Sequence, residues 1–595
     1  MAFKYYALIC GGTGCESSKA DDIYKNLVRE SELQGVHDDV QVVKTGCFGF
    51  CEQGPIVKIL PDESFYVQVD PEDAKEIIAE HIVKGREVER LVYKPGDSDA
   101  RPKFEDIEFY QKQFRVVLRN CGLIDPDNID EYIARDGYAA LEKVLFEMSP
   151  DDVIEELKKS QLKGRGGAGF PTWLKWNFTK KAEGDGKYVV CNADEGDPGA
   201  YMDRSTLEGD PHSLLEAMAI AGYTIGADKG YIYIRAEYPI AIDKLKKAMA
   251  DASEYGLLGE DILGSGFDFD VEIRLGAGAF VCGEETALLA SIEGERGMPI
   301  PRPPFPSVKG LWQKPTLINN VETWTNVPVI INNGGDWFAK IGTETSKGTK
   351  VFALTGKINN SGLVEVPMGT TLREIVYDIG GGIPGGKEFK AVQTGGPSGG
   401  VITAEYLDTP IDYENLKALG SIMGSGGMIV MDEDDCMVDV SKFYLGFCVD
   451  ESCGKCAPCR VGGRTLYNIL ERLTKGLGEM DDIEKMKRIG RAMQKASLCG
   501  LGQTAPNPIL STLKYFEDEY LAHIKDDRCP AGKCKELITY YILPDKCIGC
   551  GVCARRCPVN AITGERRKPH LIDHDICIKC GECSLACKFD AVMVR

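Results

Sequence analysis

Short runs of apolar residues, each followed by a glycine-bearing turn, alternate with helical stretches through much of the chain. Strands are predicted where apolar and β-branched residues cluster, and helices where apolar residues recur every three or four positions. The predicted strands cover 4–9, 40–44, 56–60, 188–191, 231–234 and 271–275, and the predicted helices 20–32, 71–83 and 151–162. Strands that alternate with helices are typical of α/β folds, whose ligands lie at the loop ends of a sheet.

The pattern changes several times along the chain, which indicates a multidomain α/β protein. A polar stretch containing Pro and Gly, between Lys94 and Pro102, separates a small α/β unit from a longer, glycine-rich one. Short strands follow, with a turn at 359–362 and a helix that Thr371 and Glu374 open as a capping box. The remainder is helical in composition and then rich in cysteine. The predicted domains are 1–98, 103–345, 346–435, 436–526 and 527–595.

Composition disfavours several classes of protein. The 595 residues carry 70 Lys and Arg against 91 Asp and Glu, a formal net charge of −21. Because an acidic surface repels phosphate backbones, we expect no nucleic-acid partner, although small acidic electron carriers can dock on a local basic patch. No apolar run reaches about 18 residues and no secretion-type start is present, so we expect no membrane span and a cytoplasmic location.

The 23 cysteines are the most informative feature. An odd number without a secretion signal disfavours a disulfide framework, because the cytosol keeps unliganded thiols reduced. Four cysteines lie near the N-terminus and fifteen lie between Cys448 and Cys587, a clustering that indicates metal ligation. The isolated thiols are predicted to be buried, small apolar side chains; they are Cys121, Cys191, Cys282 and Cys436.

The C-terminal module contains one cysteine spacing twice, as Cys547, Cys550, Cys553 and Cys557 and again as Cys577, Cys580, Cys583 and Cys587. In two-cluster bacterial ferredoxins each triplet binds one 4Fe-4S cluster, and the distant fourth cysteine binds the other cluster. We therefore predict one cluster on Cys547, Cys550, Cys553 and Cys587, and a second on Cys577, Cys580, Cys583 and Cys557. Paired zinc ribbons are the alternative, but they need two cysteine pairs and a longer spacer.

Two further groups of four cysteines suit iron–sulfur clusters. The triplet Cys453, Cys456 and Cys459 lies beside a helical segment, and with Cys499 as the nearest downstream ligand it suits a third 4Fe-4S cluster. At the N-terminus, one glycine-bearing loop carries Cys10 and Cys15 and another carries Cys47 and Cys51. Four thiolates on two such loops suit a 2Fe-2S cluster, with a zinc knuckle as the alternative.

Glycine-rich and acidic loops lie at the predicted strand ends of the long α/β segment. Residues 164–169 satisfy G-x-G-x-x-G, a weak match because a helix precedes them where a dinucleotide fingerprint has a strand. Their backbone amides, with Arg165 and Lys175, still suit a phosphate. The loops 191–198 and 276–286 present acidic and amide side chains, which suit ribose hydroxyls and the rim of a flavin or nicotinamide.

These loops carry a resemblance to a known family. Residues 164–170, 191–198, 283–288, 319–323 and 452–460, in this order, resemble motifs of the NADH- and FMN-binding subunit of respiratory complex I. The N-terminal part resembles thioredoxin-like 2Fe-2S ferredoxin domains. The order of all parts is similar to the beta subunit of electron-bifurcating [FeFe]-hydrogenases and to diaphorase subunits of NAD-dependent hydrogenases and formate dehydrogenases.

The resemblance implies a fold and cofactors for each part. The implied domains are a thioredoxin-like ferredoxin domain, a Rossmann-like FMN and NADH domain, a ubiquitin-like, soluble-ligand-binding β-grasp domain, a helical-bundle 4Fe-4S domain and a C-terminal two-cluster ferredoxin domain. The implied cofactors are FMN, NAD(H), one 2Fe-2S cluster and three 4Fe-4S clusters.

The resemblance also assigns residues to the two nucleotides. FMN is expected to be held by Gly164, Arg165, Gly166, Lys175, Asn192, Asp194, Asn319, Asn320 and Thr323. The nicotinamide nucleotide is expected near Glu195, Asp197, Phe178, Phe280, Phe305, Glu284 and Glu285, with Glu285 at the adenosine ribose. Phe280 replaces a Tyr that is usual in the family, and Asp197 replaces a Glu. Because a carboxylate at the ribose repels a 2′-phosphate, we expect NAD rather than NADP.

The implied reaction is hydride transfer between NAD(H) and FMN, followed by one-electron steps through the clusters. No side chain is expected to act as a general acid or base. Since the chain resembles no hydrogen- or formate-activating site, we expect a hetero-oligomer with a hydrogenase catalytic subunit and a small 2Fe-2S subunit, and ferredoxin as a further partner. A formate dehydrogenase diaphorase is the alternative within this class, and a non-redox, zinc-rich scaffold is the alternative outside it.

One group of potential ligands is not part of the complex I subunit. Cys448, His523, Cys529 and Cys534 offer three sulfurs and one imidazole, which suit tetrahedral zinc between the helical and ferredoxin segments. The alternative is a surface histidine with incidental thiols, because these residues are scattered along the sequence.

Overall fold

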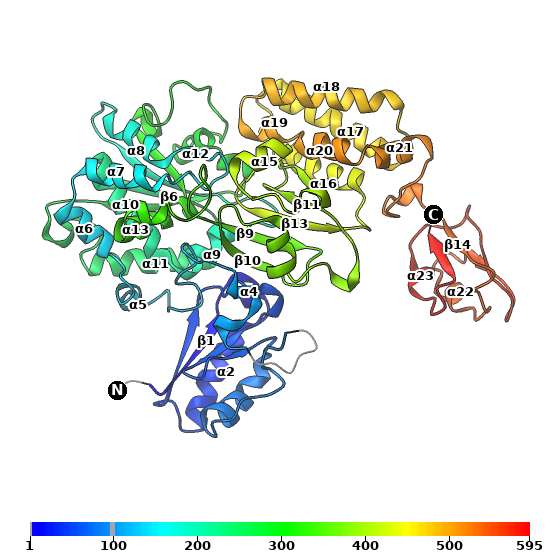
Figure 1. The fold of residues 1–595 in the computed structure, drawn as a ribbon, viewed down its shortest axis with the longest axis horizontal. Coiled ribbons are helices and arrows are strands. Elements are labelled where there is room, and N and C mark those ends of the chain that lie inside the picture. Colours follow the sequence, from blue (N-terminus) through cyan, green and yellow to red (C-terminus); the bar gives the residue numbers. More distant parts are fainter. Residues whose placement is uncertain (1–2, 96–101, 595) are drawn as a thin grey trace. The chain divides into compact units, whose positions relative to one another are not determined.

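The computed structural model describes residues 3–95 and 102–594, so residues 96–101 of the predicted link and the boundary at residue 98 lie outside the described residues. The chain divides into two compact units (Figure 1). The first comprises Met1–Lys387 and Ala391–Val430, and the second Glu388–Lys390 and Met431–Arg595. The multidomain α/β class is confirmed, whereas the five domain boundaries stay predictions. No helix among the described residues has the length and apolar character that a bilayer span requires.

The N-terminal part of the first unit is a four-stranded sheet of order β2-β1-β3-β4. Its strands are β1 (Tyr5–Cys10), β2 (Val40–Thr45), β3 (Val57–Leu60) and β4 (Ser64–Tyr66). The other elements are α1 (Thr13–Ser17), α2 (Ala20–Leu33), η1 (Cys51–Gln53), η2 (Pro71–Asp73), α3 (Ala74–Glu76) and η3 (Ile77–Ile82), of which the last three form the helix predicted over 71–83. Because β1 and β2 are parallel, the loops that follow them, and their cysteines, meet at one edge of the sheet.

A parallel sheet of order β7-β6-β5-β8 forms the centre of the next part. Its strands are β5 (Tyr188–Ala193), β6 (Lys229–Arg235), β7 (Asp270–Gly276) and β8 (Thr316–Asn320). Strands β5, β6 and β7 were predicted and are confirmed. Strand β8 was not predicted, because its apolar run is only two residues long. The main helices are α5 (Ile129–Ile133), α6 (Ala139–Glu147), α7 (Pro150–Ser160), α8 (Thr172–Lys181), α9 (Met202–Gly209), α10 (Pro211–Ile225), α11 (Pro239–Glu254), α12 (Glu285–Ile292) and α13 (Val321–Asn333).

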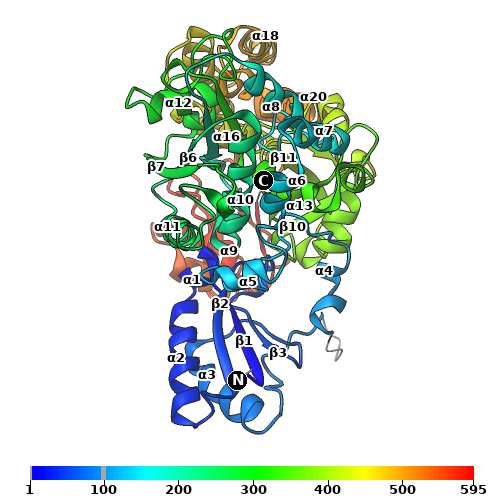
Figure 2. The same cartoon turned by 90° about the vertical axis from the view of Figure 1, so that its left-hand side faces the viewer.

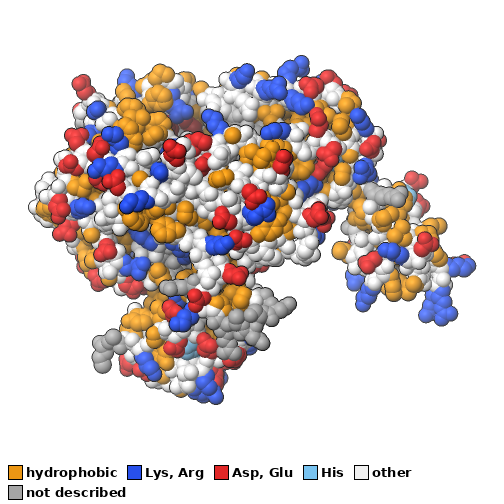
Figure 3. Space-filling model, viewed as in Figure 1, with side chains coloured by type: hydrophobic (Ala, Val, Ile, Leu, Met, Phe, Trp, Pro, Cys, Tyr) orange, Lys and Arg blue, Asp and Glu red, His pale blue; other side chains and the backbone are white. Residues whose placement is uncertain are grey.

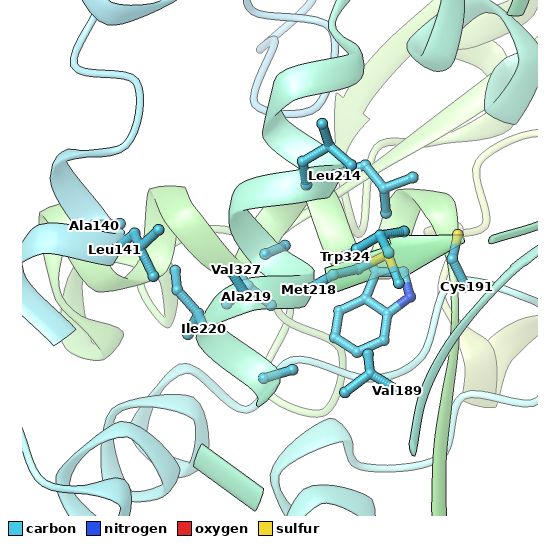
Figure 4. Close-up of a cluster of buried hydrophobic side chains, with 14 of the residues drawn as sticks. Ala140, Leu141, Val189, Cys191, Leu214, Met218, Ala219, Ile220, Trp324 and Val327 are labelled. Carbon is cyan, nitrogen blue, oxygen red and sulfur yellow. The ribbon is translucent and has the colours of Figure 1, made fainter. Parts of the chain in front are cut away.

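Helices α10 and α13 pack on each other and on this sheet. Met218 of α10 and Trp324 of α13 are fully buried, and the Trp324 indole lies beside Met218 and Val189 of β5 (Figure 4). Burying one large apolar side chain stabilises a fold by about 1.5–3 kcal/mol. This core holds the strand ends in fixed positions.

A mixed five-stranded sheet of order β10-β9-β13-β11-β12 follows. Its strands are β9 (Thr349–Gly356), β10 (Gly362–Pro367), β11 (Phe389–Thr394), β12 (Val401–Thr403) and β13 (Gly427–Asp432). The predicted capping box is present, since the Thr371 amide donates to the Glu374 carboxylate (2.9 Å) and the Glu374 amide donates to Thr371 Oγ1 (3.2 Å). The helical turns that it opens include η8 (Glu374–Ile379), and α15 (Tyr413–Leu419) precedes β13.

A buried ion pair joins this sheet to the parallel sheet. Lys350 of β9 and Glu322 of α13 are both buried and paired with each other. Lys350 also donates to the Ser425 carbonyl (2.6 Å), and Glu322 accepts from the Val351 amide (2.9 Å). These additional hydrogen bonds offset the cost of removing both charges from water. The start of α13, directly after β8, is thereby held against the mixed sheet.

The second unit combines a helical bundle with the cysteine-rich module. The bundle helices are α16 (Met437–Asp450), η11 (Pro458–Gly462), α17 (Gly463–Thr474), α18 (Met480–Ala496), α19 (Gly500–Thr504), α20 (Asn507–Tyr515) and α21 (Glu517–Lys525). The module contains β14 (Tyr540–Ile542), α22 (Val552–Arg556), β15 (Ile562–Thr563), β16 (Leu571–Ile572), α23 (Glu582–Leu585) and β17 (Val592–Val594). Since β14 pairs with β17, the end of the second cysteine repeat returns to the start of the first.

Candidate functional site

Loops from separate parts of the chain meet at the carboxyl ends of the parallel strands. Asn192 near the end of β5 is the register partner of Asn320 at the end of β8, so two predicted site residues are neighbours. The Asn192 side-chain amide donates to the Gly283 carbonyl (2.8 Å), which brings the loop after β7 to the same edge. The amide of Asp194, whose side chain is buried, donates to Asn192 Oδ1 (3.1 Å).

The glycine-rich loop of residues 164–169 is held by the mixed-sheet part. The Tyr413 hydroxyl donates to the Gly164 carbonyl (2.7 Å). Gly167 has a φ of 112°, and a Cβ there would lie 3.1 Å from the Gly424 backbone, so only glycine fits. The Arg165 guanidinium is fully buried and donates to the carbonyls of Lys163 (3.0 Å) and Lys347 (2.6 Å). Arg165 therefore anchors the loop. The Gly164 and Arg165 amides donate to the Phe170 carbonyl and to Thr323 Oγ1, so the amides of residues 166–169 are the groups suited to a phosphate.

Lys175 and Glu285 lie together, although they come from different predicted motifs. Lys175 Nζ lies 3.3 Å from one carboxylate oxygen of Glu285, and Arg302 Nη1 lies 2.5 Å from the other. Burial raises the pKa of Glu285, but the charges of Lys175 and Arg302 outweigh burial and hold that pKa below its ordinary value. Glu285 is thus an ionised carboxylate with two cationic neighbours.

Several predicted site residues also have structural roles. Glu195 accepts from the backbone amides of Asp203 (3.0 Å) and Arg204 (3.1 Å) at the start of α9, and burial raises its pKa. Asn320 donates to Asp203, and its oxygen accepts from the Thr323 amide (3.4 Å) as the N-cap of α13. Together these contacts fix α9 to the end of β8.

Three other predicted side chains accept hydrogen bonds at the same edge of the sheet. Thr323 Oγ1 accepts from the Arg165 amide (2.8 Å). Glu284 caps α12 by accepting from the amides of the next turn. Asn319, in the orientation that satisfies its neighbours, accepts from the Trp176 indole (3.0 Å).

Asp197 is a predicted site residue with unused hydrogen-bonding capacity. Its Oδ2 accepts from the Ser425 hydroxyl (3.0 Å), whereas its buried Oδ1 has no hydrogen-bond partner among the described residues. A Cβ on Gly396 would collide with the Asp197 carboxylate, so the chain approaches it closely. Burial, reinforced by the charge of Glu195, raises the pKa of Asp197 to about 7 despite the Ser425 hydrogen bond. An orphaned buried oxygen of this kind fits a ligand that donates a hydrogen bond.

Aromatic side chains are available for stacking. Phe178 of α8 and Phe305 expose 47% and 53% of their surface, and Phe280 is half-buried. Exposed aromatic faces suit the rings of a nucleotide. The loop amides as donors, the Asp197 oxygen as an acceptor and these ring faces together fit FMN and a nicotinamide nucleotide.

The four N-terminal cysteines come together at the edge of their sheet. The neighbouring thiols of Cys15 and Cys47 raise the pKa of Cys10 well above its ordinary value, and the Gly49 amide donates to the Cys47 sulfur (3.3 Å). A Cβ on Gly54 would lie only 2.8 Å from the Cys15 sulfur. Converging thiols with an amide donor and close glycine backbone fit an iron–sulfur cluster.

The helical segment also brings its predicted ligands together. Cys459 lies beside Cys456, and the Ser452 hydroxyl lies 3.2 Å from the Cys459 sulfur. Cys499 is the N-cap of α19, and a Cβ on Gly502 of this helix would lie 2.9 Å from Cys459 Cβ. The helix α19 therefore carries Cys499 to the triplet.

The C-terminal module groups its cysteines across the two repeats. One cavity is lined by Cys547, Cys550, Cys553 and Cys587, and another by Cys557, Cys577, Cys580 and Cys583. The Ala561 amide donates to the Cys557 sulfur (3.2 Å), and the Lys579 amide to the Cys577 sulfur (3.4 Å). The structure thus places the same sets of four around two cavities as the ferredoxin spacing predicts.

Family models match four parts of the chain. Residues 157–329 match the Nuo51 FMN-binding domain, 439–523 the NADH-ubiquinone oxidoreductase-F iron-sulfur binding region, and 3–81 the thioredoxin-like [2Fe-2S] ferredoxin. The 4Fe-4S binding domain matches twice, at 540–563 and 570–593.

Similar proteins agree with these matches. NADP-reducing hydrogenase subunit HndC of Solidesulfovibrio fructosivorans is 62% identical over 77% of this chain and 94% of its own length. An NADH-quinone oxidoreductase subunit of Rhizobium meliloti is 46% identical over 70% of this chain and 99% of its own. The chain belongs to the oxidoreductase family that contains hydrogenase subunit HndC and this NADH-quinone oxidoreductase subunit. A crystal structure of NAD+-reducing [NiFe]-hydrogenase in the H2-reduced state aligns at 29% identity with a TM-score of 0.62, over 88% of this chain and 85% of its own.

This family member also contains a fifth group of potential metal ligands, whose members differ from the prediction. Cys436, His523, Cys529 and Cys534 are all buried, with their ligand atoms within 4.8 Å of one another. The prediction of Cys448 is wrong, because Cys436 and Cys448 lie at opposite ends of α16, about 18 Å apart at 1.5 Å per residue. Cys448 lies in the apolar core of the bundle. The alternative of a surface histidine is also wrong, since His523 is fully buried.

The candidate flavin site of this protein includes side chains that sequence motifs did not indicate. Tyr413, Ser425 and Lys350 come from the mixed-sheet part and reach the glycine-rich loop, Asp197 and the start of α13. No local signal identifies them, because their partners lie 28 to 249 positions away in the sequence.

Replacing Asp197 by Asn should change the pH dependence of stability. The pKa of Asp197 is raised to about 7 in the folded protein. At low pH the carboxyl is neutral in both the folded and the unfolded protein, so its burial does not lower the free energy of unfolding. As the pH rises to about 7, the carboxyl ionises first in the unfolded protein, and the free energy of unfolding of the wild type falls. We expect flavin-free Asp197→Asn to match the wild type near pH 4 and to be more stable near pH 8, by up to about 4 kcal/mol.

Urea unfolding followed by tryptophan fluorescence measures this difference, because all five Trp lie between residues 173 and 337. Asp185→Asn, at a carboxyl whose side chain is 87% exposed, is the matched control and should show no such difference. A difference between Asp197→Asn and the wild type that did not vary with pH would contradict the raised pKa.

Proposed function

We propose that the chain is the flavin and iron–sulfur subunit of a cytoplasmic, electron-bifurcating hydrogenase complex. It exchanges hydride between NAD(H) and FMN and passes single electrons to or from ferredoxin and a hydrogenase subunit, beside a small 2Fe-2S subunit. One observation carries the proposal: a single polypeptide combines the FMN-binding match at 157–329 with four groups of four cysteines, suited to one 2Fe-2S and three 4Fe-4S clusters.

Two alternatives are weaker. A diaphorase subunit of an NAD-dependent formate dehydrogenase needs the same parts, but the relative at 62% identity is named a hydrogenase subunit. A non-redox, zinc-rich scaffold does not account for the flavin-binding match, nor for cysteines that surround two cavities in crossed sets of four.

FMN supplies the redox chemistry, because it exchanges an electron pair with nicotinamide and single electrons with clusters. The chain binds and orients the nucleotides. Arg165 anchors the glycine-rich loop to the Lys347 carbonyl, and the amides of residues 166–169 would hold the phosphate of FMN. Phe178 and Phe305 offer ring faces, and Asp197 Oδ1 would accept a hydrogen bond from a bound nucleotide. No residue is assigned a proton transfer.

Glu285 is the residue proposed to select the nucleotide. An ionised carboxylate accepts hydrogen bonds from the adenosine ribose hydroxyls and repels a 2′-phosphate. Two observations oppose this preference for NAD(H). Lys175 and Arg302 compensate part of the Glu285 charge, and the relative HndC is named a subunit of an NADP-reducing hydrogenase. The proposal is NAD(H), and substitution of Glu285 is its direct test.

The subunit purified anaerobically should contain FMN and iron and reduce a viologen dye with NADH more rapidly than with NADPH. Glu285→Gln should lower the NADH to NADPH ratio of kcat/KM by about tenfold or more, because a hydrogen bond to a charged group contributes about 1.5–3 kcal/mol. Glu295→Gln, at an exposed carboxyl of the same region, should leave the ratio unchanged. Colourless, FMN-free protein would overturn the function, and equal wild-type rates with both nucleotides would overturn only the NAD(H) assignment.

Ferredoxin is the proposed partner of the C-terminal module. Between residues 546 and 568 the chain carries six Lys and Arg and one Glu, although the whole chain has a net charge of −21. Arg555, Arg556 and Arg567 are exposed, and the Arg567 amide donates to the Gly549 carbonyl in the first cysteine loop (3.0 Å). Figure 3 shows Lys and Arg side chains gathered at one end of this module. A positive surface beside a cluster is complementary to a small acidic electron carrier.

Reversing two of these charges should slow electron exchange with an acidic ferredoxin. We expect Arg555→Glu/Arg556→Glu to lower the rate of ferredoxin reduction at low ionic strength by at least tenfold, with a weaker salt dependence, and to leave NADH–viologen activity unchanged. Lys246→Glu, at an exposed lysine of α11, is the control. An unchanged rate with ferredoxin would contradict this docking surface.

Zn²⁺ is the ion proposed for Cys436, His523, Cys529 and Cys534. Three sulfurs and one imidazole match the tetrahedral preference of zinc, and His523 Nε2 lies 3.4 Å from Cys436 Sγ and 3.3 Å from Cys534 Sγ. His523 Nδ1 donates to the Glu519 carbonyl (2.7 Å), and the Lys533 amide donates to the Cys529 sulfur (3.4 Å). Such outer contacts orient metal ligands.

Metal analysis of two cysteine variants tests this site. The wild type should contain one zinc per chain, Cys436→Ser should lose it, and Cys448→Ser should retain it, because the Cys448 thiol is not in the group. Iron as the sole metal of the intact protein would contradict the proposal, as would loss of zinc only in Cys448→Ser.

A further inference from the structure

Helix α9 joins the N-terminal sheet to the candidate flavin site. Figures 1 and 2 both show α9 at the junction between β1, β2 and the parallel-sheet part. Its first turn is fixed from the flavin side, where Glu195 caps it and Asp203 accepts from Asn320. The position of α9 is therefore fixed relative to the residues at the end of β8.

The loops that carry the N-terminal cysteines rest on the same helix. The amide of Thr13, between Cys10 and Cys15, donates to Glu208 of α9 (3.1 Å), and the Thr13 hydroxyl donates to the other carboxylate oxygen. Gly46, directly before Cys47, packs so closely on Gly209 that a Cβ would collide with its Cα. Both cysteine loops are thus positioned by α9.

Tyr201, the residue before α9, reaches a cysteine of the N-terminal group. Its hydroxyl donates to the Cys51 sulfur over 3.5 Å. The Tyr201 ring lies 5.7 Å from the Arg204 guanidinium and packs on a buried apolar cluster that includes Leu118 and Val351. The Tyr201 side chain is therefore held by contacts other than the sulfur.

The loop that carries Cys51 is fixed independently of Tyr201. The Glu52 amide donates to the Ser361 carbonyl (3.1 Å), and the Leu363 amide donates to the Gly49 carbonyl (2.7 Å). Because donor and acceptor are both held by other contacts, removal of the hydroxyl should leave the two backbones in place.

We propose that Tyr201 is a positioning residue that completes the N-terminal cluster site from the flavin-binding part and raises the reduction potential of the cluster bound there. A phenolic hydroxyl is protonated at neutral pH and donates to the sulfur. Reduction adds one electron and so makes the sulfurs more negative, which strengthens this hydrogen bond and favours the reduced cluster. This inference rests on the proposed 2Fe-2S cluster.

The test is an EPR-monitored redox titration of the 2Fe-2S signal in the complete subunit. Tyr201→Phe removes the donor and keeps the ring. Poised at the wild-type midpoint, the variant should show a ratio of reduced to oxidised cluster about threefold lower, because the lost hydrogen bond is stronger in the reduced state than in the oxidised state. Tyr223→Phe, which removes a hydroxyl bonded to the Met148 carbonyl (2.9 Å), should titrate like the wild type.

Each outcome distinguishes this inference from the proposed function. An unchanged midpoint in Tyr201→Phe with full iron content overturns the role of Tyr201 alone, as does loss of the 2Fe-2S signal with retained FMN, since the hydroxyl would then serve assembly and not potential. A wild type without any 2Fe-2S signal instead refutes the N-terminal cluster. A lowered midpoint in Tyr201→Phe only, with unchanged visible circular dichroism, supports the inference.

Discussion

Parallel pairing of β5 with β6 and β8 is the constraint on which the candidate flavin site depends. Parallel strands end at one edge, so loops from positions far apart in the sequence meet there. The register that pairs Asn192 with Asn320 also fixes the start of α13 and, through Asp203, the start of α9. A shift of one residue would turn each of these side chains to the opposite face.

The mixed-sheet part completes this edge instead of forming a separate appendage. Tyr413 holds the glycine-rich loop, Ser425 binds Asp197, and the buried pair of Lys350 and Glu322 fastens the two sheets. Breaking such a pair would leave a buried charge without a partner, which costs several kcal/mol. The glycine-rich loop therefore depends on residues more than 200 positions away for its conformation.

The cysteine groups of both units share one type of contact, in which the backbone approaches a sulfur closely. Sulfurs approach glycine or backbone amides, as at Gly49 with Cys47 and at Lys579 with Cys577. Amide donors stabilise thiolates without adding a formal charge, and their number and burial adjust the potential of a cluster. In the N-terminal group a side chain from another part of the chain, Tyr201, adds a further donor.

The sequence by itself determined the α/β class, the strands β1, β2, β3, β5, β6 and β7, a few of the helices, and the grouping of the cysteines, because periodicity and ligand spacing are local properties. It did not identify β8, whose apolar run is short. It also assigned Cys448 to the zinc group and Cys436 to the isolated buried thiols, and both assignments are wrong, because the sequence does not tell which end of α16 faces His523. Only the tertiary structure decided which of them faces His523, and that Arg165 anchors a loop. These outcomes depend on packing between segments distant in sequence, which no local pattern encodes.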